Sequence, residues 1–404
     1  MFVSLTVLCL FHFGSETNSV QVYEGTILMK TIFIAFFILT LASCGGSGTD
    51  SIVIEPIDSS APESNSPDIN TYPGVIWETF PAADVGMSQS AIDQALEYAF
   101  ESSRNTQGVV IVRHGVVVAE RYANGSSQDS LATSWSTGKS FASALIGIAL
   151  KQEFLDSIDV PAETYLTEWA DTNKTDITLR AILEMRSGLG KAAKGDSNIY
   201  TSGGISGDQL AYALDRHPET IARTDNWAYQ NTDSMLIGGI LEAATGQPLA
   251  DFADTYLFSK IGMSATWWTD EVGNVMTYCC IDATSRDFAR FGLLFARDGR
   301  WQDEQIITAQ WVTDSTTVPT GTNNPYYALQ WWVEPAYGYF YSAGLHQNNI
   351  YVYPQYDLVI VRNSSYTKIG DEAIRSEANY HSTLAPSNWS DADFLTPIIN
   401  AINQ

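Results

Sequence analysis

The stretch Trp135-Ser136-Thr137-Gly138-Lys139-Ser140, followed by the nearly all-apolar run Phe141 to Leu150, decides how the whole chain is interpreted. The length and composition of this run are typical of a buried helix. If the helix starts at the quoted residues, Ser136 and Lys139 lie three positions apart on one face, within reach of each other. A serine hydroxyl needs a base to become a nucleophile, and burial can lower the pKa of a lysine until it serves as that base. The stretch predicts Ser136 as nucleophile and Lys139 as its first proton acceptor.

The same S-x-x-K pattern occurs a second time, from Ser365 to Lys368. This copy follows an expected strand and leads into the polar pair Gly370-Asp371, with no apolar helix that would bury the lysine. The surroundings therefore favour Ser136.

A tyrosine and an asparagine stand together in Tyr229-Gln230-Asn231, before an apolar stretch. A tyrosine there can relay a proton between Lys139 and a leaving group, while Asn231 holds the lysine or a substrate carbonyl. Their structural alternative is a core tyrosine and a helix-capping asparagine. An earlier Y-x-N, Tyr122 to Asn124, only ends an expected hairpin.

The order of expected elements predicts the fold class. Helices are expected from Ser88 or Ser90 to about Arg104, over the apolar run, and at 235–244, 287–297 and 393–402; strands are expected at 109–113, 116–122, 339–341, 350–353 and 358–362. Strands near both ends with helices between them predict an α+β protein, in which helices flank one antiparallel sheet and a mostly helical subdomain is inserted.

The motifs resemble, in content and order, those of the serine β-lactamase and penicillin-binding-protein superfamily, and in particular class C β-lactamase-like hydrolases such as family VIII esterases and 6-aminohexanoate-dimer hydrolases. The resemblance covers roughly residues 108–362. It rests on the stretch around Ser136, on Ile177-Thr178-Leu179-Arg180 with Leu183 to Leu189, on Tyr229-Gln230-Asn231, and on Ser285 to Gly292. It implies a β-lactamase-like fold and hydrolysis of an ester or amide through an acyl-enzyme on Ser136, without a cofactor; the S-x-x-K serine is the nucleophile of related class A enzymes.

The family's third motif is usually K-T-G on a strand beside the site, and its best match here is Ser342-Ala343-Gly344. The lysine, which helps hold a substrate carboxylate in β-lactam-recognising relatives, is absent. This absence favours neutral esters or amides over β-lactams. By resemblance, the backbone N–H groups of Ser136 and Leu345 form the oxyanion hole.

Other residues are candidates for substrate contact. Asn231, Gly344, Leu345 and His346 are the expected substrate-binding positions, although a lone loop histidine is often structural. Tyr200 is a weaker candidate for a substrate lid. Trp331 and Trp332 either wall the acyl pocket or are core aromatics.

The charge balance restricts the partners. With 21 basic and 46 acidic residues, the net charge is 21 − 46 = −25, which repels nucleic acid and anionic lipid. The expected partner is a small-molecule ester or amide.

The N-terminus has the pattern of an export signal. Met29-Lys30 opens the apolar run Thr31 to Thr40, and Leu41-Ala42-Ser43-Cys44 resembles a bacterial lipobox. The resemblance implies lipidation of Cys44 and a periplasmic, outer-membrane or cell-surface location, with residues 1–28 a misassigned start and 29–44 a signal peptide. The alternative is a short membrane anchor, but the run is shorter than the ~20 residues that span a bilayer. Residues 45–73 are predicted to be a flexible linker before a hydrolase domain at 74–404.

Of the four cysteines, Cys9 and Cys44 lie outside the expected mature fold. The neighbours Cys279 and Cys280 are expected to be two packed thiols, and no Cys/His spacing indicates a metal. Gly138-Lys139-Ser140 resembles the end of a phosphate-binding loop, but Thr133 stands where that loop needs glycine. No G-x-S-x-G occurs, which argues against an α/β-hydrolase. The alternatives that stay open are a penicillin-binding or sensor-type surface protein that acylates without turnover, and a weak β-lactamase.

Overall fold

The computed structural model describes residues 71–402 except 124, 191–198, 200–206 and 218–225. All of these residues belong to one compact unit. The predicted signal peptide, Cys44, nearly all of the predicted linker, and Tyr200 lie outside the described residues. Thr71 and Tyr72 already contact the folded domain, since Arg297 donates to the Thr71 carbonyl at 2.7 Å and the Tyr72 ring packs against Trp301.

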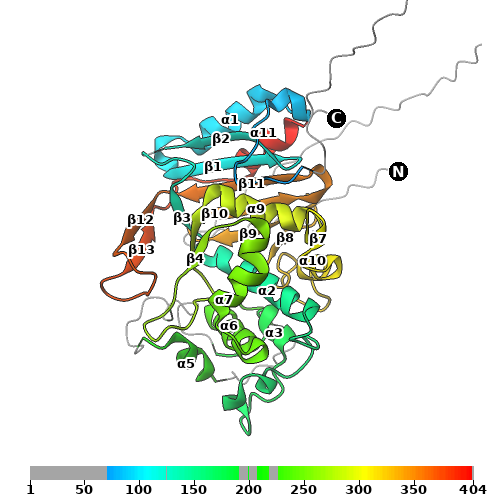
Figure 1. Ribbon diagram of the computed structural model, residues 1–404, viewed down its shortest axis with the longest axis vertical. Coiled ribbons are helices and arrows are strands. Elements are labelled where there is room, and N and C mark those ends of the chain that lie inside the picture. Colours follow the sequence, from blue (N-terminus) through cyan, green and yellow to red (C-terminus); the bar gives the residue numbers. More distant parts are fainter. Residues whose placement is uncertain (1–70, 124, 191–198, 200–206, 218–225, 403–404) are drawn as a thin grey trace, which may run out of the picture. The chain divides into compact units, whose positions relative to one another are not determined.

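An antiparallel six-stranded sheet in the order β2-β1-β11-β10-β9-β8 forms the centre of the domain (Figure 1). β1 and β11 bring the two ends of the chain together, with Val110 opposite Val361. This sheet confirms the predicted α+β class. Its strands are β1 (Thr106–Arg113), β2 (Val116–Tyr122), β8 (Trp332–Glu334), β9 (Tyr339–Gly344), β10 (Asn348–Tyr353) and β11 (Leu358–Ser364).

Helices cover both faces of the sheet. In Figure 1, α1 (Gln89–Ala99) and α11 (Asp391–Asn400) lie on one side and α9 (Ser285–Ala296) on the other. Because successive strand residues point to opposite faces, Val109 and Ile111 pack with the first pair of helices, while Val110 and Val112 pack with the cluster that includes α9. The two covered faces explain why β1 is buried at nearly every position and carries an apolar run from Val109 to Val112.

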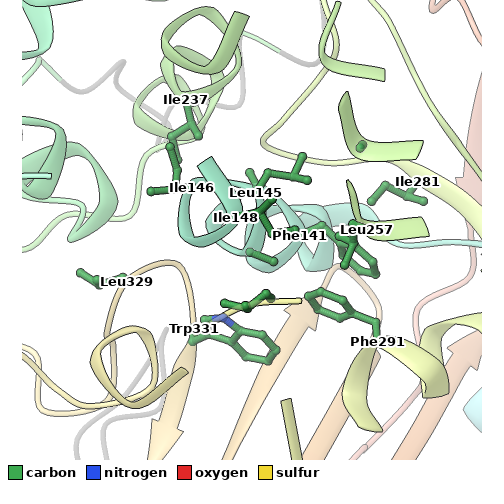
Figure 2. Close-up of a cluster of buried hydrophobic side chains, with 14 of the residues drawn as sticks. Phe141, Leu145, Ile146, Ile148, Ile237, Leu257, Ile281, Phe291, Leu329 and Trp331 are labelled. Atoms are coloured by element: carbon green, nitrogen blue, oxygen red, sulfur yellow. The ribbon is translucent and has the colours of Figure 1, made fainter. Parts of the chain in front are cut away.

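The second half of the domain is mostly helical, as predicted, and is built around α2 (Gly138–Lys151). Figure 2 shows Phe141 and Leu145 of this helix surrounded by side chains from several other elements, Ile237, Phe291 and Trp331 among them. Burying each such side chain stabilises the fold by roughly 1.5–3 kcal/mol. The other helices here are α3 (Leu179–Leu183), α5 (Gln209–Leu214), α6 (Asn231–Thr245), α7 (Leu249–Ala253), α8 (Ser259–Ile261) and α10 (Ala309–Ser315).

Short strands complete the domain, and the sequence pattern did not predict them. They are too short to show an alternation of apolar and polar residues. A three-stranded sheet has the order β3-β5-β4, β12 pairs with β13, and β6 pairs with β7. Their bounds are β3 (Leu131–Thr133), β4 (Ala265–Trp267), β5 (Ile281–Thr284), β6 (Arg300–Trp301), β7 (Glu304–Gln305), β12 (Tyr366–Ile369) and β13 (Tyr380–Thr383).

One predicted boundary was wrong. α1 ends at Ala99 instead of near Arg104, because Ser102–Arg104 form a separate 3-10 helix and Asn105 turns the chain with a left-handed φ of 51°. None of the helices among the described residues has both the length and the apolar character needed to cross a membrane.

Candidate active site

The proposed nucleophile lies in a sharp turn at the start of α2. Thr133 ends β3, Trp135–Thr137 form a 3-10 helix, and α2 follows at once with Gly138. Trp135 has a left-handed φ of 47°, a conformation that bulky residues rarely adopt and that concentrates at functional sites. The turn leaves Ser136 partly exposed and buries Lys139, whose side chain is only 2% accessible.

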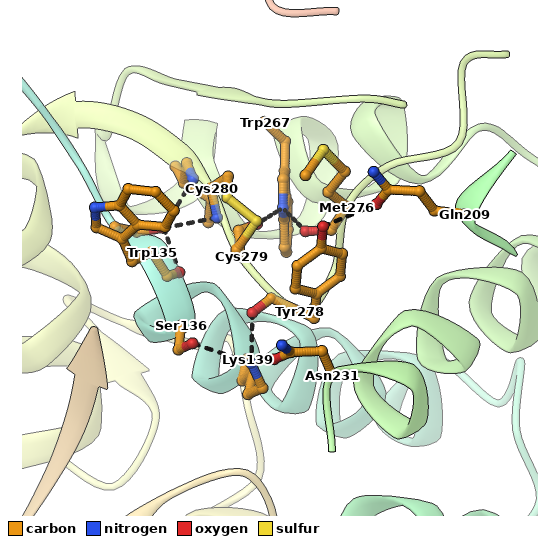
Figure 3. Close-up of a disulfide and its surroundings, with 12 residues drawn as sticks. Trp135, Ser136, Lys139, Gln209, Asn231, Trp267, Met276, Tyr278, Cys279 and Cys280 are labelled. Carbon is orange, nitrogen blue, oxygen red and sulfur yellow. Dashed lines mark hydrogen bonds between the residues drawn. A yellow bond between two sulfur atoms is a disulfide. The ribbon is translucent and has the colours of Figure 1, made fainter. Parts of the chain in front are cut away.

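The Lys139 amine lies within hydrogen-bond distance of oxygen atoms from Ser136, Asn231 and Tyr278. Its Nζ lies 3.2 Å from Ser136 Oγ and donates to Asn231 Oδ1 at 2.8 Å and to the Tyr278 carbonyl at 2.6 Å (Figure 3). A neutral amine has two N–H groups, and the two carbonyl oxygens, which only accept, take both of them. A neutral Lys139 bonded in this way can turn its lone pair to the Ser136 hydroxyl, which lies within hydrogen-bond distance. This is the arrangement that a general base requires.

Tyr229 and Asn231 come to the same place from the start of α6. The Tyr229 ring lies 4.9 Å from Lys139 Nζ, and its hydroxyl forms a hydrogen bond with Ser136. Burial raises the pKa of Tyr229 to about 12, although the bond to Ser136 lowers it somewhat. The phenol therefore keeps its proton at neutral pH and can donate it.

β9 passes directly over the nucleophile turn. A Cβ at Gly344 would lie 2.2 Å from the carbonyl oxygen of Ser134, so only glycine fits there without displacing backbone. Ser342, which stands where relatives carry lysine, is fully buried, with its Oγ 3.4 Å from Thr137 Oγ1. Position 342 thus supplies no positive charge for a substrate carboxylate.

Hydrogen bonds with side chains of β10 and β11 hold the turn after β9 in place. Asn348 Nδ2 donates to the Leu345 carbonyl at 2.6 Å, the Gly344 N–H donates to Asn349 Oδ1 at 3.1 Å, and the buried Arg362 donates to the carbonyls of His346 and Gln347. Within the described part of the chain, the Leu345 N–H has no hydrogen-bond partner. A backbone donor that is held in place and left unpaired, next to Gly344 where β9 meets the nucleophile turn, matches an oxyanion hole.

His346 is tied to the nucleophile turn through β13. Its Nδ1 lies 2.8 Å from Thr383 Oγ1, and the same oxygen accepts a hydrogen bond from Trp135 Nε1 at 2.8 Å. Burial lowers the pKa of His346, a backbone contact with Thr383 opposes this, and the nearby Arg362 charge lowers it further. His346 is therefore neutral at pH 7. Sequence reasoning missed Thr383, because no motif marks it.

Comparison with known proteins identifies the family. The family model described as Beta-lactamase matches residues 89–382, most of the chain. The chain belongs to the Beta-lactamase family.

Two relatives of this Beta-lactamase-family chain are hydrolases. The 6-aminohexanoate-dimer hydrolase of Paenarthrobacter ureafaciens is 22% identical over 292 residues, which are 65% of this chain and 73% of that enzyme. Esterase EstB of Burkholderia gladioli is 28% identical over 205 residues, 45% of this chain and 51% of that enzyme. The predicted superfamily and the class, serine hydrolase, are confirmed.

Solved structures show the same fold. A penicillin-binding protein homologue from Pyrococcus abyssi superimposes with a TM-score of 0.56 at 17% identity, over 69% of this chain and 74% of that one. This likeness supports the β-lactamase-like fold.

The second S-x-x-K of this Beta-lactamase-family chain has a different geometry. Ser365 directly precedes β12, which contains Lys368. Residues an odd number apart in a strand point to opposite faces, and Lys368 Nζ lies 3.8 Å from Asp282. Lys368 is therefore paired with a carboxylate and lies on a strand, unlike the helical and buried Lys139.

Trp331 and Trp332 were each considered as a core aromatic or as a wall of the acyl pocket, and the structure places them differently. Trp331 is fully buried and stacks with Phe291 in the core. Trp332 is partly exposed, and its ring lies 6.2 Å from that of Tyr229. Only Trp332 is placed to touch a substrate.

The prediction of two thiols at Cys279 and Cys280 was wrong, because the structure joins them in a disulfide. Adjacent cysteines meet here because Cys280 has a left-handed φ of 83°. Within the described ranges, no group of three or more His, Cys, Asp or Glu side chains is arranged to hold a metal ion.

Proposed function

We propose that the chain hydrolyses a carboxylic ester or amide through a covalent acyl-enzyme on Ser136. The observation that carries the proposal is the environment of Lys139, whose Nζ lies 3.2 Å from Ser136 Oγ and is bonded to two carbonyl oxygens, so that the neutral amine can accept the Ser136 proton. The relatives, a 6-aminohexanoate-dimer hydrolase and an esterase, support the same reaction class.

The reaction begins when Lys139 takes the Ser136 proton and the alkoxide attacks the substrate carbonyl. The N–H groups of Ser136 and Leu345 stabilise the negative oxygen of the tetrahedral intermediate. Tyr229, protonated at neutral pH, gives its proton to the leaving oxygen or nitrogen and recovers one from the Lys139 ammonium. Water then attacks the acyl-enzyme, and the acid departs as Ser136 regains its proton.

The substrate we propose is neutral at the end that contacts β9. Ser342 is buried and uncharged, and it is occupied with Thr137. Trp332, stacked beside Tyr229, offers an apolar surface for the acyl or leaving group. Short-chain esters therefore suit this site better than β-lactams, which carry a carboxylate.

A substrate panel tests the proposal. It consists of p-nitrophenyl esters, a chromogenic cephalosporin and a linear amide. For the short esters, kcat/KM should exceed that of the cephalosporin by at least about tenfold, a difference of roughly 1.4 kcal/mol in transition-state binding. Equal or reversed values would mean that another residue binds the carboxylate, and acylation without release would favour the sensor-type alternative.

We also propose that the chain is an exported lipoprotein anchored through Cys44, on the strength of the lipobox-like sequence Leu41-Ala42-Ser43-Cys44. Labelled palmitate should enter the protein expressed in a bacterium and be absent from Cys44→Ala. Incorporation that survives this substitution would refute the anchor.

A further inference from the structure

One loop, Met276 to Ile281, lies directly against the nucleophile turn (Figure 3). It supplies the Tyr278 carbonyl that accepts from Lys139 Nζ at 2.6 Å. The next two residues, Cys279 and Cys280, form a disulfide that is almost entirely buried. The disulfide therefore begins one residue after a contact of the proposed base.

The loop and the turn fit each other closely. A Cβ at Gly138, in the middle of the S-x-x-K stretch, would lie 2.8 Å from the carbonyl carbon of Cys279. The Cys280 N–H lies 3.2 Å from the Trp135 carbonyl oxygen and 3.1 Å from Ser134 Oγ. No side chain separates the two segments at these positions.

Further contacts fix the loop on its other side. Trp267 Nε1 donates to the carbonyls of Cys279, at 2.8 Å, and Met276, at 3.0 Å. The Tyr278 hydroxyl donates to Gln209 Oε1 at 2.8 Å. The Tyr278 carbonyl is thus held between anchored neighbours and cannot turn away from Lys139 without the loop moving.

The backbone at Cys280 needs a constraint. Its φ of 83° lies in the left-handed region, which residues with a side chain adopt at a cost. A bond between its sulfur and that of Cys279 closes a small ring around their shared peptide and so removes the freedom to relax into extended conformations.

We propose that the Cys279–Cys280 disulfide is a positioning device for the general base, because it holds the Tyr278 carbonyl where it takes one N–H of Lys139 and leaves the lone pair facing Ser136. This inference rests on the proposed function. Lys139 would still be present without the disulfide, but its amine could rotate, and proton transfer from Ser136 would slow.

The proposal makes the enzyme sensitive to a dithiol reductant. Two electrons and two protons convert the disulfide into two thiols, while the reductant becomes a cyclic disulfide. The Tyr278 carbonyl then loses the constraint of the disulfide and is held only by the hydrogen bonds of the loop, whereas Trp332, β9 and the turn at His346 are bonded elsewhere. The step affected is the activation of Ser136, so kcat falls and KM stays nearly constant.

The test compares the loss in two backgrounds. Cys279→Ala with Cys280→Ala should lower kcat for a p-nitrophenyl ester, and the rate at which a fluorophosphonate labels Ser136, by tenfold or more, with KM unchanged within twofold. In a Lys139→Ala background, the same two cysteine substitutions should change the residual labelling rate by less than twofold. The disulfide acts through Lys139, so without Lys139 its loss has no further effect on the activation of Ser136. Equal losses in both backgrounds, or full activity in the pair variant, would overturn the proposal.

Two controls keep the outcome decisive. Dithiothreitol should slow the parent protein as the substitutions do, once alkylation shows that Cys279 and Cys280 have been reduced, and should leave the pair variant unaffected. If the pair variant loses its folded circular dichroism signal, the reduced and still folded parent decides the test. Peptide mapping of the purified protein, alkylated before reduction, should find no free thiol at 279 or 280, and free thiols at both would refute the inference. Absence of turnover and of Ser136 labelling in the oxidised parent would instead refute the proposed function.

Discussion

Replacing Gly344 by alanine perturbs the oxyanion hole without touching a reacting group. The added methyl carbon would lie 2.2 Å from the Ser134 carbonyl oxygen and 2.8 Å from that of Asn348. Carbon and oxygen approach comfortably only to about 3.3 Å, so β9 or the nucleophile turn must shift by about 1 Å. Both crowding atoms belong to the backbone and cannot swing aside.

The shift acts on both proposed oxyanion donors, since Leu345 directly follows Gly344 and Ser136 lies two residues after Ser134. A misplacement of about 1 Å costs on the order of 10²-fold in rate, and loss of one oxyanion donor costs about 10²–10³-fold. We expect kcat/KM of Gly344→Ala to fall by about 10²-fold, or roughly 2.7 kcal/mol.

The assay is p-nitrophenyl butyrate hydrolysis with the folded fraction measured by circular dichroism. The matched control is Gly74→Ala, where the added carbon meets no atom closer than 3.7 Å, and its activity should stay within twofold of the parent's. A folded Gly344→Ala protein with parental kcat/KM would refute the placement of the oxyanion hole between β9 and the nucleophile turn.

Three further outcomes follow from the site. Tyr229→Phe should lower kcat by about 10²–10⁴-fold with little change in KM, as expected for a lost proton relay; a large rise in KM alone would point to a binding role. Thr383→Val, which removes the hydroxyl that accepts from Trp135 Nε1, should lower the free energy of unfolding by about 1–3 kcal/mol and reduce kcat, whereas the exposed Thr367→Val should do neither in urea titrations and ester assays. Burial raises the pKa of both Tyr229 and Tyr353. Between about pH 10 and 12 the unfolded chain therefore loses phenolic protons that the folded chain keeps, and the melting temperature should fall as the pH rises through this window. A constant melting temperature would contradict the burial of these phenols.

The parts of the fold that could be predicted are those with a long local signal. The apolar run after Lys139 is α2, and the apolar stretches on either side of His114-Gly115 are β1 and β2. Such elements bury so much apolar surface that their periodicity survives in the sequence. The spacing of Ser136 and Lys139 likewise fixes their distance once the helix is known.

Other features depend on contacts between distant segments, which local patterns do not record. Thr383 is significant only because β13 brings its hydroxyl between Trp135 and His346. The disulfide depends on the left-handed backbone at Cys280, which the nucleophile turn stabilises through hydrogen bonds.

The sequence does limit how Trp331 and Trp332 can be placed. Neighbours in an extended segment face opposite sides, so at most one of Trp331 and Trp332 could line the site. Which one does so depends on the register of β8 against β9, where Trp332 pairs with Tyr341. The sequence alone does not give this register.

The measurement that tests the central claim most directly is the identification of the residue that a fluorophosphonate probe labels. The peptide containing Ser136 should carry the adduct, and Ser136→Ala should abolish both labelling and turnover. Lys139→Ala should cost nearly as much, since groups that act as a unit show non-additive losses, while Ser365→Ala, the matched control from the second S-x-x-K, should leave both largely intact. An adduct on Ser365, or full activity in Ser136→Ala, would contradict the account.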